Sequence, residues 1–264
     1  MAKSIIQEYI ERYSEKAIAF NNYAIKKTGL IQNQTVIKLE DYMLIGAPYQ
    51  LSMKRAIMLV ILSKEESAFF KRFQGKMCSL SIVFQPGDRP QPIKFFIRAT
   101  LGKVGPVKGR DNVSLFELQL KNTPNELIEI IGKHLGFMDA LESQYESLQG
   151  KEVPITPETM KILRYNTFME AVFSKKKVMP TLKSIAVNEI TLGFDPQKAY
   201  PAEGDQINLK LYFQSYQFSV NGKVTERKQN SHNQVLIKVA VGFTPELVEI
   251  IDDYLFRARL RERK

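Results

Sequence analysis

The same strand-and-helix pattern occurs twice in the chain, and this repeat constrains the fold more than any other feature. Residues 113–135 read VSLFELQLKNTPNELIEIIGKHL, and residues 235–255 read VLIKVAVGFTPELVEIIDDYL. Each copy is an alternating apolar stretch, a Thr-Pro pair and then Glu-Leu-x-Glu-Ile-Ile. The alternation predicts a strand with one buried face, and the later leucines and isoleucines have the spacing of an amphipathic helix. The repeat therefore predicts two copies of one structural unit.

The sequence around the repeat indicates what each unit contains. Thr123 and Thr244 suit the N-cap of a helix, and Pro124 and Pro245 suit its first position. Upstream, SLSIVFQ (79–85) resembles NLKLYFQ (208–214), and Gly-Lys-Val recurs at 102–104 and 222–224. Short strands at intervals of about 8–12 residues, without intervening helices, are typical of antiparallel barrels or sandwiches. We expect a mainly β protein with flanking helices, built from two tandem antiparallel β-barrels that are each closed by a C-terminal helix.

A further helix is expected before the first barrel. Apolar residues step by three and four positions along this segment, which is typical of one amphipathic helix ending near Gly29. They are Ile6, Ile10, Tyr13, Ala17, Phe20 and Ala24. The apolar face would pack either on its own barrel or on a partner. Residues 146–160 contain Gly, Pro and charge without apolar periodicity, which indicates a boundary. The expected domains are 1–150 (helix and barrel), a linker at 151–162, and 163–264 (second barrel and its helix).

Composition narrows the class of protein. Of the 264 residues 44% are apolar, enough to build packed cores, which excludes a disordered chain. No apolar run approaches the roughly 20 residues that span a bilayer, and the charged N-terminus is unlike a signal peptide. Cys78, the single cysteine, lies in an apolar run and is expected to be a buried thiol in a reducing cytoplasm. The two histidines lie far apart and no nucleotide-binding or hydrolase fingerprint occurs, so we expect no metal, no cofactor and no enzymatic activity.

The net charge of +10 favours anionic partners. Much of it is local, in the C-terminal FRARLRERK (256–264) and in three lysines at 175–177. Binding of nucleic acid would require aromatic side chains interleaved with the basic ones, and the tail offers only Phe256. The sequence therefore does not favour nucleic acid as the partner.

Two segments of the second half are similar to the motifs of a known family. MKILRYNTFMEAVF (160–173) and NEITLG (188–193) resemble the R-x-x-x-R and [D/N]-x-S-x-x-G motifs of PilZ domains, which are receptors for cyclic di-GMP. Residues 1–150 resemble the PilZ-like N-terminal domain that precedes a PilZ domain in spirochaete proteins. YQLSMKRAIMLVILSKEESAFFKRFQGKM (49–77) and IEIIGKHL (128–135) carry that likeness. The resemblance covers nearly the whole chain and implies a tandem PilZ protein with a degenerate cyclic di-GMP motif.

The resemblance also implies which residues would bind the ligand. Arg164 matches the first arginine of the first motif, and Phe168 stands where the second arginine belongs. Asn188 and Gly193 match the ends of the second motif, whereas Ile190 stands at its serine position. The candidate ligand-binding residues are Arg164, Asn188 and Gly193, with Lys161, Phe168 and Ile190 as further candidates.

Two functions are compatible with these residues. The first is a non-enzymatic signalling effector that binds cyclic di-GMP at the linker and barrel face and passes the signal to a protein partner by reorienting its domains. Losing one arginine fork at a charged contact costs on the order of 2–4 kcal/mol, which predicts micromolar or weaker affinity. The alternative is a degenerate PilZ adaptor that does not bind cyclic di-GMP and acts through protein contacts alone.

Overall fold

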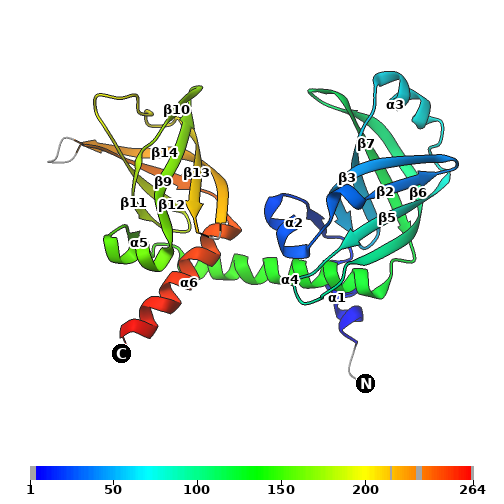
Figure 1. Ribbon diagram of the computed structural model, residues 1–264, viewed down its shortest axis with the longest axis horizontal. Coiled ribbons are helices and arrows are strands. Elements are labelled where there is room, and N and C mark those ends of the chain that lie inside the picture. Colours follow the sequence, from blue (N-terminus) through cyan, green and yellow to red (C-terminus); the bar gives the residue numbers. More distant parts are fainter. Residues whose placement is uncertain (1–3, 215, 230–233, 263–264) are drawn as a thin grey trace. The chain divides into compact units, whose positions relative to one another are not determined.

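The protein consists of two compact units, Met1–Met138 and Asp139–Lys264. The computed structural model describes residues 4–214, 216–229 and 234–262, so the last two residues of the basic tail lie outside the described part (Figure 1). The division falls within the long helix α4 (Asn125–Leu148). The finer domain limits expected from the sequence, with a linker at 151–162, stay a prediction.

The first unit is a closed β-barrel. Its strands pair in the order β1-β3-β2-β5-β6-β7-β4, and an additional β3–β4 ladder closes six of them. The strands are β1 (Ala17–Ala19), β2 (Val36–Leu39), β3 (Tyr42–Ser52), β4 (Arg55–Ile61), β5 (Met77–Phe84), β6 (Ile93–Val107) and β7 (Arg110–Lys121). Alternate residues fill the interior, among them the fully buried Ile37, Met58, Leu80 and Phe116. Leu127, Ile131 and Leu135 of α4 pack against this core, as the apolar periodicity predicts.

Short helices surround the first barrel. They are α1 (Ile5–Tyr13), α2 (Asn22–Thr28), the 3-10 turn η1 (Gln32–Gln34) and α3 (Lys64–Lys71). Helix α3 begins with a capping box, in which Ser63 and Glu66 each bond the other's backbone N–H. Its phenylalanines continue the core, because Phe70 is buried and lies 6.0 Å from the Phe116 ring.

The predicted continuous N-terminal helix is wrong. The segment forms α1, then the edge strand β1, then α2, and Ala17–Ala19 pair with Gln50–Ser52 of β3. Asn21 caps α2 by accepting from the Ala24 N–H at 2.8 Å. Pairing with the sheet edge satisfies the backbone of the middle residues and buries Ile18, so tertiary structure overrides the helical periodicity. The expected end is confirmed, because Gly29 terminates α2 in the left-handed conformation.

The second unit contains an 8-stranded sheet in the order β10-β9-β13-β14-β15-β12-β11-β8. The strands are β8 (Val153–Pro154), β9 (Tyr165–Phe173), β10 (Lys176–Val178), β11 (Thr181–Ile185), β12 (Glu189–Phe194), β13 (Gln206–Phe213), β14 (Tyr216–Gln229) and β15 (Val235–Val241), with helices α5 (Pro157–Leu163) and α6 (Pro245–Glu262). Strands β9 and β11 approach each other, but no ladder joins them in the described residues. The mainly β class with flanking helices is confirmed, whereas closure of the second barrel stays a prediction.

The two units follow one topology. The neighbours β4-β7-β6-β5-β2 of the first sheet correspond to β12-β15-β14-β13-β9 of the second. Helices α4 and α6 follow the equivalent strands β7 and β15. The repeated Gly-Lys-Val marks a close approach of strands, because a Cβ on Gly222 would lie 2.8 Å from the Ala240 carbonyl oxygen. The internal repeat therefore extends over five strands and the helix that follows them.

The predicted helix starts are confirmed only in part. Pro245 is the first residue of α6, and the Thr244 carbonyl accepts from the Val248 N–H at 3.2 Å. In the first unit the helix begins at Asn125, one residue later than expected. Its first carbonyl to accept from an N–H four residues on is that of Pro124, which accepts from Ile128. Among the described residues, no hydrogen bond makes either threonine hydroxyl the cap of its helix. The Thr123 hydroxyl donates to the Met53 carbonyl at 2.6 Å and that of Thr244 to Gly242 at 3.1 Å, so both stabilise loops.

Two further expectations can be compared with the structure. Cys78 is buried, and this burial raises the pKa of its thiol to about 11, so the prediction of a structural thiol is confirmed. Among the described residues, no helix combines the length and the apolar character that a membrane span requires.

Candidate functional site

Helix α5 places Arg164 at the start of the first long strand of the second unit. The helix begins with a capping box in which the Thr156 hydroxyl accepts from the Thr159 N–H at 3.2 Å and the Thr159 hydroxyl accepts from the Thr156 N–H at 2.7 Å. The Thr159 hydroxyl also donates to the Pro154 carbonyl at 2.7 Å, which ties α5 to β8. Arg164 ends the helix as its C-cap, with its side chain exposed. A short, anchored helix thus fixes the backbone from which this guanidinium projects.

The backbone from the end of α5 into the first residues of β9 is strained. Arg164 has φ 55° and Thr167 has φ 58°, both in the left-handed region, where a β-branched threonine is a genuine outlier. The β9–β13 register shifts here, because Tyr165 pairs with Phe213 and Met169 with Leu211, so three residues face Tyr212 alone. Strain of this kind costs about 1–3 kcal/mol per residue and is concentrated at functional sites. Thr167 was not among the candidate residues, because no local sequence pattern predicts a threonine in the left-handed conformation.

Thr167→Asn is expected to stabilise the second unit by about 1 kcal/mol, because asparagine tolerates the left-handed conformation that a β-branched side chain resists. Urea unfolding measures the change in the free energy of unfolding. Thr225→Asn is the matched control, since Thr225 is exposed in β14 without positive φ. Because its hydroxyl donates to the Lys238 carbonyl at 3.3 Å, this variant should lose up to about 1 kcal/mol and should not gain stability. A Thr167→Asn protein less stable than the parent would show that Thr167 is not strained.

The strained segment lines an open groove of about 600 Å³. Its lining includes Lys161, Arg164, Tyr165, Asn166, Thr167 and Gln214. The Gln214 N–H donates to the Arg164 carbonyl at 2.9 Å, which holds the two sides of the groove together. Burial raises the pKa of Tyr165 to about 12, so its phenol stays protonated.

Neither cation of the groove forms an ion pair among the described residues, although Lys161 interacts electrostatically with the Glu158 carboxylate. Within the described part of the chain, neither Lys161 nor Arg164 has a carboxylate at ion-pair distance, and both side chains are exposed. An arginine fork and a neighbouring ammonium are the groups that bind phosphate oxygens. The groove is therefore equipped to receive an anion.

Phe168 follows the groove-lining Thr167 in sequence, and its aromatic side chain is exposed without itself lining the groove. Its ring is 38% exposed and lies 5.0 Å from that of Tyr212, and the Lys210 ammonium lies 5.4 Å from the Tyr212 ring centroid. On the same strand, Glu170 pairs with Lys177 at 2.8 Å. The structure thus places Phe168 beside a second ring on an accessible face, where a planar group can stack.

The second motif does not converge on this groove. Asn188 lies half-buried in the β11–β12 turn, and its carbonyl accepts from the Val241 N–H at 3.0 Å. Ile190 is fully buried in the interior of the sheet. Gly193 lies beneath Lys183, whose Cε would be 2.6 Å from an added Cβ, and it lines a different cavity of about 730 Å³. Of the candidates, the structure brings only Lys161 and Arg164 into one groove, and Phe168 follows the lining residues in sequence.

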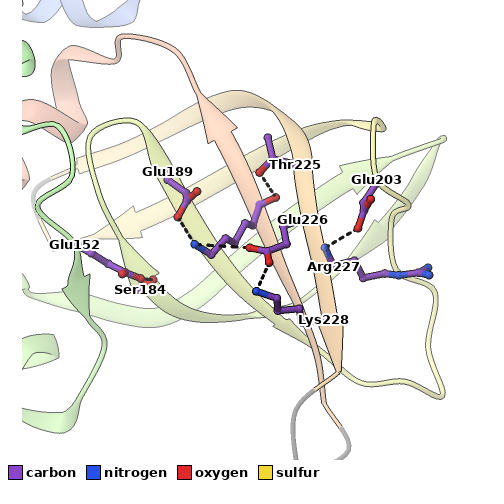
Figure 2. Close-up of polar contacts among 9 residues, drawn as sticks. Glu152, Ser184, Glu189, Glu203, Thr225, Glu226, Arg227 and Lys228 are labelled. Atoms are coloured by element: carbon purple, nitrogen blue, oxygen red, sulfur yellow. Dashed lines mark hydrogen bonds and ion pairs between the residues drawn. The ribbon is translucent and has the colours of Figure 1, made fainter.

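The outer face around the second motif carries paired charges (Figure 2). Lys238 lies 3.0 Å from Glu189 and 3.9 Å from Glu226, which also pairs with Lys228. The hydrogen bond to Glu189 raises the pKa of Lys238, and the one from Lys228 lowers that of Glu226. Because these cations already have carboxylate partners, this face is a weaker anion site than the groove at Arg164.

Comparisons with solved structures give chains of similar length at low identity. The PlzA protein of Borreliella burgdorferi in complex with c-di-GMP is 15% identical, with a TM-score of 0.45, and the match covers 94% of this chain and 97% of that one. MrkH of K. pneumonia in complex with c-di-GMP is 12% identical, with a TM-score of 0.35 and 98% of each chain covered. YcgR of Escherichia coli in complex with c-di-GMP is 7% identical, with a TM-score of 0.31 and coverage of 91% and 89%. No curated protein matches the chain in sequence.

The comparison with protein families gives a match to the first unit. The model of the PilZN3 domain matches residues 4–137, just over half of the 264 residues. This range includes the six-stranded closed barrel and the first part of α4. The expected PilZ-like N-terminal domain is thereby confirmed, and the chain belongs to the PilZN3 domain family.

Proposed function

We propose that the protein is a non-enzymatic cytoplasmic signalling effector that binds cyclic di-GMP in the groove between α5 and β9. In this proposal a PilZ-type domain follows the PilZN3 domain, as in tandem spirochaete proteins. The observation that carries it is the strained groove lined by two cations, Lys161 and Arg164, that form no ion pair among the described residues, followed in sequence by the exposed Phe168. Arg164 is also the position at which the sequence resembles the first PilZ motif.

The groove matches the chemistry of the ligand. Cyclic di-GMP has two phosphates and two guanines, so it needs cationic groups for the former and flat surfaces for the latter. Arg164 would bind a phosphate with two N–H groups, and Lys161 would add a point charge. The Phe168 ring would stack on a guanine, a contact of about 1–3 kcal/mol per base. Asn188 and Gly193 do not line this groove and stay in the proposal only through the resemblance, whereas the buried Ile190 is left out.

Titration calorimetry with cyclic di-GMP tests this function. We expect a dissociation constant in the micromolar range or weaker, because Phe168 replaces the second arginine of the motif. GMP, with one phosphate and one guanine, serves as the control and should bind more weakly. The proposal fails if the parent protein shows no heat at high micromolar cyclic di-GMP while circular dichroism shows an intact fold. Reorientation of the two units on binding stays a prediction, which fluorescence energy transfer between labels on them would measure.

A different observation favours the adaptor function. On the outside of the first barrel, Val36 pairs with Ile45 on one side and with Ser81 on the other, and Ser81 pairs with Phe96. Ile61 stands on β4, the other neighbour of β3. The exposed fractions of Ile45, Ile61 and Phe96 are 70%, 82% and 70%. Such a row of exposed apolar side chains is typical of a protein-binding surface.

The charges around this apolar row (Val36, Ile45, Ile61 and Phe96) indicate its partner. Lys38, Lys94 and Arg98 flank the row, and none has an ion pair within the described residues. The Lys94 ammonium lies 4.9 Å from the Phe96 ring centroid. Complementarity therefore favours an acidic segment with apolar anchors.

For an adaptor, Ile61→Asp is expected to weaken partner binding by about tenfold or more, because it places a carboxylate in the apolar contact. Arg164→Ala should leave the same binding unchanged. Surface plasmon resonance with one purified partner compares the two variants. If Arg164→Ala abolishes binding and Ile61→Asp does not, the adaptor function at this surface is wrong.

A further inference from the structure

The first unit contains a cavity of about 300 Å³ that lies apart from the apolar row. Three segments distant in sequence enclose it: the end of α2, residues 86–89 after β5, and the first turns of α4. This volume is at the lower end of the range of about 300–1,000 Å³ typical of small-molecule sites. It has room for a bicyclic ring system, whereas a cyclic dinucleotide is far too large.

Close packing fixes the walls of the cavity. The Gln85 N–H donates to the Gly29 carbonyl at 2.7 Å, which joins the end of α2 to the segment that follows β5. On α4, a Cβ at Gly132 would lie 2.3 Å from the ring of Tyr9, so α1 packs directly on this helix. The Thr28 hydroxyl donates its proton to the Ala24 carbonyl at 2.7 Å, so this hydrogen bond also fixes the wall formed by α2. The cavity is therefore held by backbone contacts and buried packing.

The inner lining combines apolar surface with one neutral polar group. His134 is only 8% exposed, and burial together with the nearby Lys27 lowers its pKa, so the imidazole is neutral near pH 7. A neutral imidazole offers one donor and one acceptor. Ile130 and the ring of Phe137 supply apolar surface, and the Lys27 ammonium lies 5.1 Å from the Phe137 centroid. This lining suits a flat ring with hydrogen-bonding edges.

The rim carries balanced charge. Lys27, Arg89 and Lys133 are matched by Asp88, Glu126 and Glu129, and Lys133 pairs with Glu129 at 2.8 Å. Three cations against three anions leave no net charge to attract a phosphate. The rim does offer both donors and acceptors to the edge of an uncharged ring.

We propose that this cavity binds an uncharged bicyclic heteroaromatic group of the purine type, as a free base or a nucleoside. The ring lies against Phe137, and its edge exchanges hydrogen bonds with His134 and with the carboxylates and ammonium groups of the rim. The site lies wholly in the first unit, so it does not depend on the groove at Arg164. A purine has donors and acceptors on its edges and a face that stacks on a phenyl ring, which is what this lining provides.

Saturation-transfer NMR and calorimetry with guanosine, inosine and adenosine test the proposal. We expect at least one nucleoside to bind with a dissociation constant below ~1 mM. Phe137→Ala should weaken this binding about fivefold or more, through loss of the stacking surface. His134→Leu, which keeps an apolar side chain at a buried position but removes the donor and the acceptor, should weaken it similarly.

Phe256→Ala is the matched control, because Phe256 is 61% exposed on α6 in the other unit and should bind the nucleoside like the parent. Thermal melting checks that each variant is folded. If His134→Leu does not fold, the comparison of Phe137→Ala with the parent tests the proposal on its own. Phe137 is 37% exposed, so its removal leaves the core intact. Failure of all three nucleosides to bind, or equal binding by parent and Phe137→Ala, overturns the proposal.

Discussion

Gly29→Ala is expected to destabilise the first unit by about 3 kcal/mol or more, because the change combines backbone strain with a backbone clash. Gly29 has φ 71°, and a Cβ there would lie 1.9 Å from the Gln85 carbonyl oxygen and 2.4 Å from its carbon. Neither atom belongs to a flexible side chain, so the chain itself must move. That movement would disrupt the 2.7 Å hydrogen bond between Gln85 and Gly29. Urea unfolding measures the loss.

Gly75→Ala separates the two causes. Gly75 also has positive φ, at 82°, but a Cβ there would meet nothing within 4 Å. This variant should therefore show only the cost of the left-handed conformation, about 1–2 kcal/mol. If the two variants lose the same stability, the close approach of Gly29 to Gln85 contributes nothing, and the described junction of α2 with β5 is wrong.

Arg164→Ala is expected to weaken the binding of cyclic di-GMP by about 30- to 1000-fold, or 2–4 kcal/mol. The reason is that Arg164 is the arginine fork of the proposed groove, and Lys161 can replace its charge but not its geometry. Arg164→Lys should recover part of the loss for the same reason. Calorimetry compares the dissociation constants.

Arg259→Ala is the control for this effect, since Arg259 is an exposed arginine of α6 in the same unit and should bind cyclic di-GMP like the parent. An Arg164→Ala protein that binds cyclic di-GMP as tightly as the parent would contradict the groove as the ligand site. An equal loss in both variants would indicate a general effect of net charge.

The strand-and-helix repeat could be predicted because its information is local. Alternation in β7 and β15, and the apolar spacing of α4 and α6, directly reflect which faces are buried. The structure of the N-terminal segment could not be predicted in this way. Its residues Ala17–Ala19 join the sheet by pairing with β3, which is distant in sequence. Helical spacing alone does not reveal an edge strand that tertiary contacts impose.

The site was predictable only in part. The resemblance to the first PilZ motif identified Arg164, with Lys161 as a further candidate, and both residues line the same groove. The strain at Thr167 and the contact of Gln214 with Arg164 depend on the register shift between β9 and β13. No local sequence pattern predicts that shift. Burial of Ile190 also shows that restoring the serine of the second motif would place a hydroxyl in the core, at a cost of about 2–5 kcal/mol. Phe168→Arg alone is therefore the better restoration of the motif.

The cavity lined by His134 had no signal in the sequence. His134 lies within a helical pattern, and the residues around it come from positions 27–28, 86–89 and 126–137. Only the folded barrel brings these three segments together. A cavity built in this way can be recognised from structure but not from the spacing of residues.

The central claim is that cyclic di-GMP binds the groove between α5 and β9. Mapping the backbone amide NMR shifts of the full chain during a titration with cyclic di-GMP tests it most directly. We predict that the shifts concentrate in residues 157–168 and around Gln214, and that they saturate with a micromolar or weaker dissociation constant. The absence of saturable shifts in this segment, or shifts confined to the first unit, would contradict the claim.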